Sequence, residues 1–362
     1  MRFTILLSLI AAGAGCGGLD AVNAIGFDKT STIAPGWTRH DLNTKAGLLS
    51  VWSSGSDVVA CGGTNALAHS IDGGKSFSQP SIDLGGAAGD DFAAVWGSSG
   101  TDIWLVSRTR SVLFHSTDHA NTFTEVKGVL ANTYVRALWG SGPNDIFIAA
   151  GDTMILPAPM YLYHSTDGGK TWPRTTSTSL AFEAFGGSGA GDYYSGGGFE
   201  GVNSTGNGVG SAQVIHSADA ATWSMLAPPS DWFQLAYVAT TGPGDVWFVA
   251  AHDPMYGWND RIAHSSDGGK TITPITSHSF HDIRGVTITA DGVVHLVDSP
   301  AVLKSSDHGA TWTQEVMLNV GTNEDLYGAP DDKNIALAVT PSGAIFIVAN
   351  NANGAGVVYT NQ

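Results

Sequence analysis

The sequence predicts an all-β protein, a seven-bladed β-propeller of four-stranded antiparallel blades, and three observations lead to this prediction. The first is composition: the 362 residues include 47 Gly, 14 Pro and 27 Asp, but only 5 Glu. Helix surfaces are usually rich in Glu, Lys and Arg, whereas tight turns are rich in Gly, Asp, Asn and Ser. The second and third are a turn motif that recurs six times and a strand motif that recurs seven times.

The turn motif reads Ser-x-Asp-x-Gly-x-Thr followed by an aromatic residue, and its clearest copy is STDGGKTW at residues 165–172. In such a turn the Asp carboxylate accepts hydrogen bonds from backbone amides, and Gly supplies a positive φ. We therefore expect the six Asp residues to be structural. They are Asp72, Asp118, Asp167, Asp219, Asp267 and Asp307.

The strand motif consists of an apolar strand, a turn of the type Trp-Gly-Ser-Gly-x-x-Asp, and a second apolar strand. Its turn Asp, or the residue in that place, falls at positions 57, 102, 145, 192, 245, 291 and 343, so the spacing runs from 43 to 53 residues. Each unit thus holds two inner strands, followed by two outer strands that the turn motif joins. Four strands per repeat at this period predict a propeller blade.

The two ends of the chain predict how the ring closes. The seventh unit stops before its turn motif and therefore lacks an outer strand, whereas GWTR at 36–39 is similar to TWTQ at 311–314, which ends and follows a turn motif. We expect residues near 36–41 to complete the last blade by pairing with the strand that ends near Tyr359, which removes two exposed strand edges. The predicted organisation is an export signal at 1–15, a tether at 16–33 and one propeller at 34–362, present as a monomer.

The first residues are typical of an export signal. Arg2 precedes an apolar run of about ten residues, too short to span a bilayer, and small residues then lead to Cys16. This resembles the lipobox of bacterial lipoproteins, in which the Cys is lipidated; ordinary cleavage after Ala14 or Ala24 is the alternative. The chain is expected to be exported, either lipid-anchored in a bacterial cell envelope or secreted. Cys61 lies in an apolar run and is expected to be a buried thiol.

Charge and histidine placement exclude several classes of ligand. The net charge of −16 argues against nucleic acid, because binding there is dominated by cationic contacts to phosphate. No metal or cofactor is expected. Five histidines precede the Ser of a turn motif, but equivalent positions on different blades are too far apart for one metal ion. We expect these histidines to pack between blades. They are His69, His115, His164, His216 and His264.

The six turns resemble the Asp-box, or BNR repeat, of sialidases, sortilin-type receptors and Ycf48-type photosystem assembly factors. The resemblance implies a propeller in which these turns hold the blades and rarely touch a ligand. Ycf48-type factors fit best, with seven blades and an exported chain, and imply a binding role, although the basic patch of those factors is not evident here. The sialidase likeness is weaker, because no Arg-Ile-Pro segment occurs and the candidate arginines belong to distant blades. Those arginines are Arg108, Arg110, Arg136 and Arg284.

A ligand is expected on the top face, opposite the turns, where the longest loops are 151–161, 196–211 and 251–260. The Gly-rich segment 196–210 is interpreted as a flexible surface loop. Aromatic side chains beside carboxylates suit sugar rings. Alternatively, Trp232, Phe233 and Trp258 cap the core between blades. The candidate ligand-binding residues are Trp232, Phe233, His252, Asp253, Tyr256, Trp258, His281, Asp282 and Arg284.

These observations favour a non-catalytic propeller that binds a protein or a glycan through its top face. The alternative is a sialidase-like glycoside hydrolase or lyase, which would need two carboxyl groups about 5–9.5 Å apart. The sequence offers candidate carboxylates but no pairing among them. They are Glu183, Glu200, Asp253, Asp282 and Glu324.

Overall fold

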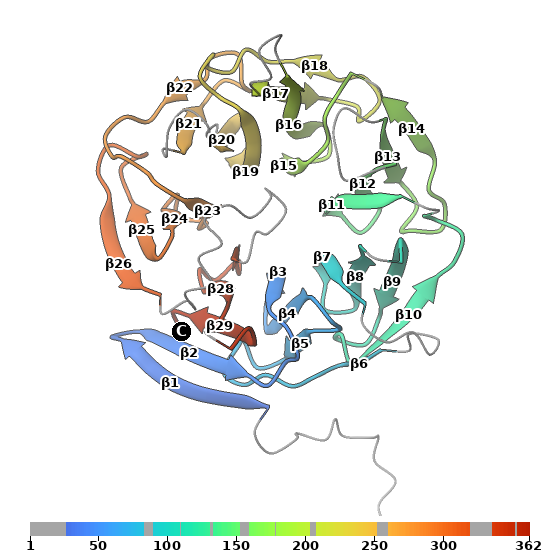
Figure 1. Cartoon of the computed structure of the whole chain (residues 1–362), viewed down its shortest axis with the longest axis vertical. Coiled ribbons are helices and arrows are strands. Elements are labelled where there is room, and N and C mark those ends of the chain that lie inside the picture. The colour runs from blue at the N-terminus through green and yellow to red at the C-terminus, as the bar shows by residue number, and fades with distance from the viewer. Residues whose placement is uncertain are drawn as a thin grey trace, which may run out of the picture.

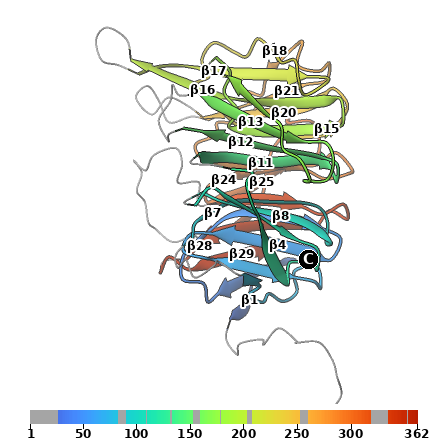
Figure 2. The ribbon, with the colours of Figure 1, turned by 90° about the vertical axis from the view of Figure 1, so that its right-hand side faces the viewer.

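The computed structural model describes residues 27–82, 90–108, 110–130, 133–152, 159–177, 179–202, 208–251, 260–318, 335–351 and 353–362, without the side chains of 199–202, 208–211 and 251. These residues form seven sheets arranged as a ring (Figure 1), and the edge view shows a flat disc (Figure 2). The predicted seven-bladed propeller is confirmed. Within the described part of the chain, no helix has the length and apolarity needed to cross a bilayer.

Each blade begins with an inner strand close to the ring axis (Figure 1). The inner strands are β3 (Leu48–Ser54), β7 (Phe92–Ser99), β11 (Tyr134–Gly142), β15 (Ala184–Gly189), β19 (Gln234–Gly242), β23 (Ile283–Ile288) and β27 (Ala336–Val339). The second strands are β4 (Asp57–Gly62), β8 (Asp102–Ser107), β12 (Asp145–Gly151), β16 (Asp192–Val202), β20 (Asp245–Ala251), β24 (Val294–Asp298) and β28 (Ile345–Asn350).

Two further strands continue each blade outward. The third strands are β5 (Leu67–Ser70), β9 (Val112–Ser116), β13 (Met160–Ser165), β17 (Gly208–Ser217), β21 (Arg261–Ser265), β25 (Ala301–Ser305) and β29 (Gly356–Thr360). The outer strands of blades 2 to 7 are β10 (Thr122–Val126), β14 (Arg174–Ser177), β18 (Ser224–Met225), β22 (Thr273–Pro274), β26 (Thr313–Met317) and β2 (Trp37–Leu42). In blade 1 the outer strand is reduced to one bridge, between His69 and Ser78. The short strand β6 (Ser81–Ile82) instead joins blade 2, parallel to β10.

The ring closes as the sequence predicts. Strand β2 pairs antiparallel with β29, with Arg39 opposite Tyr359 and His40 opposite Val358. Figure 1 shows this N-terminal strand beside the last strand of the chain. Trp37 is buried in the cluster between blades 6 and 7, together with Val302 and Tyr359. The seventh blade is therefore built from both ends of the described chain.

The predicted tether differs from the structure, because part of it is a strand. Residues Asp28–Ala34 form β1, which pairs with β2 and adds a fifth strand to blade 7. The carboxylate of Asp28 lies 2.9 Å from Nδ1 of His40 and accepts a hydrogen bond of 3.0 Å from the amide of Phe77, in blade 1. Long-range polar contacts hold this strand, and its exposed, polar sequence gave no strand signal.

In each of the six repeated turns, which we call the Asp turns, the Asp carboxylate accepts a hydrogen bond from the hydroxyl of the preceding Ser and at least one from a backbone amide of the turn. In blade 3 the carboxylate of Asp167 accepts hydrogen bonds from the amides of Lys170 (3.1 Å) and Thr171 (2.9 Å) and from the Thr171 hydroxyl (2.6 Å). The Ser165 hydroxyl accepts from the amide of Gly169 at 2.8 Å. Gly168 and Gly169 have φ of 72° and 79°, which side chains disfavour. Local side-chain bonds therefore fix the turn.

The Asp turns and the turns between inner and second strands lie on the same face of the disc. The amide of Gly73 donates to the carbonyl of Ser56, and the amide of Gly268 donates to the carbonyl of Gly244. We call this face the bottom and the opposite face the top. As the strand order predicts, both kinds of turn lie on the face opposite the loops that are expected to bind a ligand.

Replacing Asp167 by Ala is expected to lower the melting temperature by a few degrees and to leave the secondary structure intact. The change leaves the amides of Lys170 and Thr171 without their acceptor. Differential scanning calorimetry measures the shift, and Asp152→Ala, outside any Asp turn, is the control. Equal melting temperatures for the parent and Asp167→Ala would contradict the structural role of the carboxylate.

The hydrophobic core lies between neighbouring blades. Between blades 1 and 2, for example, Cys61 and Leu67 pack with Phe92 and Phe114. Cys61 is fully buried, as its apolar surroundings in the sequence predict, and burial raises the pKa of its thiol. Packing between neighbouring blades fixes the position of each inner strand along the ring axis, and this positions the residues at the top of the ring.

Candidate functional site

The inner strands carry β-bulges near the top face. In five of them, one residue falls out of register with the second strand, a distortion that redirects a side chain and often lies near functional sites. In blades 1, 2 and 5 the extra residue is apolar, whereas in blades 3 and 6 it is Arg. The five residues are Leu49, Ala93, Arg136, Ala236 and Arg284. Two guanidinium groups are thus placed at the top of the ring, three blades apart.

The first arginine belongs to a set that we call the Arg136 cluster, composed of Arg108, Tyr134, Arg136, Glu183 and Gln234. The guanidinium carbons of Arg108 and Arg136 lie 5.4 Å and 5.0 Å from the centroid of the Tyr134 ring. Nη1 of Arg136 lies 3.7 Å from Oε1 of Glu183. The cluster joins blades 2 to 5 at one level of the top face.

Glu183 is the centre of this cluster. Its Oε2 accepts hydrogen bonds from Nε2 of Gln234 at 2.6 Å and from the amide of Gly198 at 3.3 Å. The side chains of Arg136 and Glu183 are only 8% and 11% exposed. Nε of Arg108 is buried and has no hydrogen-bond partner among the described residues. A buried donor of this kind requires an explanation, such as a water molecule or a ligand.

The glycine-rich segment beside Glu183 is a paired hairpin, so its interpretation as a flexible surface loop was wrong. Strands β16 and β17 pair from Tyr193–Ser217 to Val202–Gly208, and the hairpin extends beyond the disc (Figure 2). A Cβ at Gly197 would lie 2.5 Å from Oε2 of Glu183, and one at Gly198 would lie 2.8 Å from the carbonyl oxygen of Phe233. The glycines therefore permit close approach of the hairpin to the cluster.

The second arginine belongs to the Arg284 cluster, composed of Tyr237, Asp260, Asp282, Arg284 and Asp298. Nε of Arg284 lies 2.6 Å from Oδ1 of Asp282. Oδ1 of Asp298 accepts from the amide of Asp282 at 2.7 Å, and Oδ2 of Asp260 accepts from the amide of Ile283 at 2.6 Å. The side chains of Arg284 and Asp282 are 36% and 41% exposed, so this pair faces solvent.

Burial raises the pKa of Asp282, and the neighbouring carboxylates of Asp260 and Asp298 raise it further, although the Arg284 guanidinium lowers it. The net result lies above the ordinary value. Asp282 is thus an acid whose proton affinity depends on its contact with Arg284.

The structure brings together only some of the predicted ligand-binding residues. Asp282 and Arg284 are in contact, and the 71% exposed His281 precedes them, with Nδ1 3.9 Å from Asp298. Phe233 is half-buried. Trp232 is 2% exposed and packs against Phe248, as the capping alternative proposed. The remaining four lie outside the described residues: His252, Asp253, Tyr256 and Trp258.

Sequence reasoning missed Tyr134 and Gln234 and considered Glu183 only as a possible acid. The position of a residue within its repeat could have linked two members of the cluster. Arg136 and Glu183 each precede the turn Asp of their own blade by the same interval, nine residues. Arg284 precedes Asp291 by seven residues. The number of residues between the arginine and the turn Asp varies with the bulge and with the length of the turn. Counting back from the turn Asp therefore does not place Arg136 and Arg284 in equivalent positions.

Four of the five histidines before the Asp turns bond within their own blade, so for these four the assignment to inter-blade packing requires correction. In blades 2 to 5, Nε2 of the histidine lies 2.6–3.1 Å from Oδ1 of the turn Asp of its own blade. The ring also packs on the aromatic residue two positions after that Asp, as His115 does on Trp104 at 3.9 Å between centroids. The four pairs are His115–Asp102, His164–Asp145, His216–Asp192 and His264–Asp245. His69 differs, because its Nδ1 contacts the carbonyl of His119 in the next blade.

Acid is expected to unfold the propeller, with little change in melting temperature between pH 7 and pH 5 and a steep fall below pH 4. Burial raises the pKa of Asp102, but hydrogen bonds from His115 and Ser98 outweigh it and hold that pKa below its ordinary value. Hydrogen bonds from Thr171 lower the pKa of Asp167 to about 2. Carboxylates with lowered folded pKa values contribute stability above their unfolded pKa and lose it as pH falls through the folded values.

A pH series of melting curves tests this expectation. Asp167→Asn is the matched variant, because its amide cannot titrate, and it should show a smaller loss of stability between pH 4 and pH 2. A main transition near pH 6 would contradict the expectation and would point to histidine titration instead.

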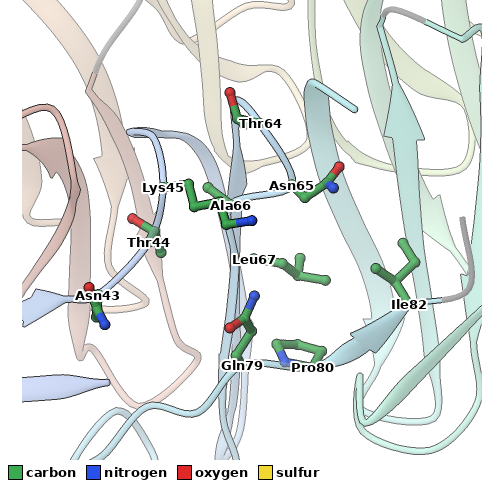
Figure 3. A pocket seen from close by; sticks show the side chains of 10 residues that line it. All are labelled: Asn43, Thr44, Lys45, Thr64, Asn65, Ala66, Leu67, Gln79, Pro80 and Ile82. Carbon is green, nitrogen blue, oxygen red and sulfur yellow. The ribbon is translucent and has the colours of Figure 1, made fainter. Parts of the chain in front are cut away.

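A separate hollow of about 290 Å³ lies at the edge of blade 1 (Figure 3). Its wall includes Thr64 and Asn65, which adopt φ of 49° and 61° and are bonded to blade 2 through Asp90 and Asp91. Among the described residues, the lining combines hydroxyl, amide and apolar side chains with one charged side chain, that of Lys45. The elements that line this hollow are not those that carry the two arginine clusters. In the described ranges, no group of three or more His, Cys, Asp or Glu side chains is arranged to hold a metal ion.

Comparisons with known proteins show the fold. No family model and no curated protein matches the sequence. A structure of Ycf48 bound to a D1 peptide is similar, with a TM-score of 0.58 and 17% identity, over 92% of this chain and 99% of that one. Ycf48 from Cyanidioschyzon merolae gives a TM-score of 0.58 and 14% identity, over 90% and 98%. An ancestral GH74 enzyme gives 0.59 and 14%, over 91% of this chain but 47% of the enzyme.

Proposed function

We propose that the protein is a non-catalytic binding propeller whose top face takes an extended segment of a partner protein. The observation that carries the proposal is the stack of Arg108 and Arg136 on Tyr134 at the top of the ring. Guanidinium groups recognise carboxylates and peptide carbonyls through several donors at once. Arg108 as a whole is half-buried, and we propose that its guanidinium group meets an acceptor of the bound peptide.

The Arg284 cluster supports the same function. Asp282 and Arg284 are half-exposed and in contact, so the top face presents an acceptor and a donor side by side. An extended peptide offers both amide donors and carbonyl acceptors along its backbone. The Ycf48 neighbour, solved with a D1 peptide, shows that a propeller of this shape can hold a peptide segment. We propose a monomer as the binding unit, with a glycan as the alternative ligand.

A random-peptide display library panned against the purified protein tests this proposal. An enriched peptide is expected, and calorimetry should show that Arg108→Ala weakens its binding by about tenfold or more. Arg174→Ala is the matched control, because Arg174 stacks on Tyr161 at 4.4 Å on the outer part of blade 3. If no peptide is enriched, or if both variants lose binding equally, the top-face proposal is wrong.

A glycoside hydrolase or lyase is the second candidate, and the raised pKa of Asp282 favours it, since a general acid must hold a proton near neutral pH. Glu183 is a poorer candidate acid, because Arg136, Gln234 and the amide of Gly198 contact its carboxylate. Release of reducing ends from a panel of soluble glycans, lost in Asp282→Asn, would establish the enzyme and refute the non-catalytic proposal.

We also propose that the chain is exported and anchored through a lipid on Cys16. The support is the apolar run and the small residues before this Cys. Phase partition in detergent tests it: the parent should enter the detergent phase, and Cys16→Ser should remain in the aqueous phase, because acyl chains contribute about 0.8 kcal/mol per buried CH₂ group. Aqueous partition of the parent would refute the anchor.

A further inference from the structure

The hairpin of blade 4 is longer than its blade, and we call its outer part the arm: residues 197–202 of β16 and 208–213 of β17. On one side, β15 pairs with β16 only as far as Gly196. On the other side, β18 pairs with β17 only at Ile215 and His216. In the described part of the chain, the two strands of the arm therefore pair only with each other, and the arm extends beyond the disc (Figure 2).

The hydrogen bonds at the base of the arm show which backbone groups face its inner edge, the edge toward the ring axis. The amide of Glu183 donates to the carbonyl of Gly196 at 2.8 Å, and the amide of Gly198 donates to the carboxylate of Glu183 at 3.3 Å. Successive residues of a strand direct their backbone groups to opposite edges. The N–H and C=O groups of Glu200 and Val202 are therefore directed to the same inner edge, where the described chain places no further strand.

The outer edge of the arm follows the same alternation. The amide of Ala212 donates to the carbonyl of Trp232 at 3.1 Å. Gly210 is the next residue along β17 that directs its backbone groups outward. The inner edge, by contrast, begins at Glu183, the centre of the Arg136 cluster, so the two edges have different surroundings.

The arm lacks the features that usually protect an exposed strand edge. Natural edges are protected by short strands, by charged residues, especially Lys, and by Pro. The two strands of the arm read GGFEGV and GVGSAQ, with one charged residue and no Pro. A two-stranded ribbon is also only marginally stable in water, and a third strand would stabilise it. Unpaired backbone groups in this arrangement are complementary to one kind of ligand, an extended chain.

We infer that the inner edge of the arm binds an extended segment of a partner protein as a third strand, through main-chain hydrogen bonds to residues 198–202. The inference rests on the proposed top-face function and adds where the segment lies and how it is recognised. Because Glu183 contacts both the amide of Gly198 and the guanidinium of Arg136, a segment on this edge lies next to the Arg136 cluster. Main-chain pairing depends on an extended backbone, so the arm should accept many sequences that form strands readily.

The probe is a short peptide of alternating Thr and Val residues with capped ends and an uncharged fluorophore. It forms strands readily and offers the arginines no charge. The full chain should bind it saturably in fluorescence anisotropy. A control probe with N-methyl groups on consecutive central residues lacks donors on both edges and should bind at least about tenfold more weakly. Hydrogen exchange should show new protection of the amides of Glu200 and Val202 when the first probe binds.

Two substitutions locate the probe on one edge of the arm. Glu200→Pro removes an amide that faces the inner edge and that β17 does not use, so the hairpin should fold and binding should fall about tenfold or more. The lost charge should not matter, because the probe is uncharged. Gly210→Pro is the matched control, because it makes the same backbone change on the outer edge, and it should bind normally.

A shortened arm decides the question if Glu200→Pro disturbs the hairpin. The variant replaces residues 200–210 by Asn-Gly, which favours a two-residue turn between the paired residues Phe199 and Ser211. It keeps the contacts of Gly198 and Ala212 with the ring. This short-arm variant should therefore melt with the parent and lose the probe.

Four results would overturn the inference. These are an absence of saturable binding to the full chain, equal binding of the two probes, equal binding by Glu200→Pro and Gly210→Pro, and normal binding by the short-arm variant. A dimer that only the short-arm variant abolishes, in size-exclusion chromatography, would also overturn it, because a second copy would then occupy the edge. The proposed function has a separate readout: a display peptide that needs Arg108 but binds the short-arm variant normally would leave that function intact and refute binding by the arm.

Discussion

A chain that lacks residues 27–42 is expected to aggregate or to melt far below the parent, because the deletion removes β1 and β2 and opens the ring. Strand β2 contributes the outer strand of blade 7, and its loss exposes the edge of β29 over residues Val357–Thr360. An unpaired edge of this kind is a site of aggregation. The deletion also removes Trp37, whose buried side chain packs with Val302 and Tyr359.

The size of the effect follows from the buried groups involved. Loss of one buried Trp side chain costs about 3–5 kcal/mol, a large part of the 5–15 kcal/mol that stabilises a typical domain. Arg39 adds polar contacts to the same strand pair, with Nη1 3.3 Å from the hydroxyl of Tyr359. Trp37→Ala alone should therefore melt well below the parent.

The matched control is a chain that lacks residues 17–26, which precede the described residues. It should melt with the parent, and light scattering during the temperature ramp should show aggregation only in the longer deletion. Equal melting of the two deletions would contradict closure by the N-terminal strand.

The sequence predicted the ring because the information that specifies it is local and repeated. Asp167 bonds to amides three and four residues away, so its role is visible in a short motif. Trp37 was recognised by its likeness to Trp312, although its partners lie at the other end of the chain. Six copies of one turn made even a distant pairing predictable, because the missing seventh outer strand had one candidate.

The candidate site was less predictable, because it depends on register and on distant contacts. Arg136 and Arg284 sit at bulges, and their intervals to the turn Asp differ by two residues, so the spacing of the repeats did not show that the two positions are equivalent. His115 was noticed, but its partner Asp102 lies across a strand pair, and only the register shows the contact. Strand β1 was missed because the bonds of Asp28 reach His40 and Phe77 rather than neighbours.

Replacing Glu183 by Ala is expected to destabilise the fold by about 3–5 kcal/mol, the usual cost of leaving one partner of a buried ion pair without the other. Glu183 and Arg136 are both about nine-tenths buried, and Nη1 of Arg136 lies 3.7 Å from the carboxylate. The variant also removes the acceptor for Gln234 and for the amide of Gly198. Urea denaturation measures the free energy of unfolding.

The exposed pair Arg261–Asp231, at 2.9 Å, is the matched control. Asp231→Ala should cost about 0–1 kcal/mol, because solvent screens surface pairs. The double variant Arg136→Met with Glu183→Gln should recover part of the stability, since no buried charge is left alone. A cost for Glu183→Ala no larger than that for Asp231→Ala would show that the Arg136 cluster is not a rigid support. The top face would then lack the fixed arrangement on which peptide binding by Arg108 and Tyr134 depends.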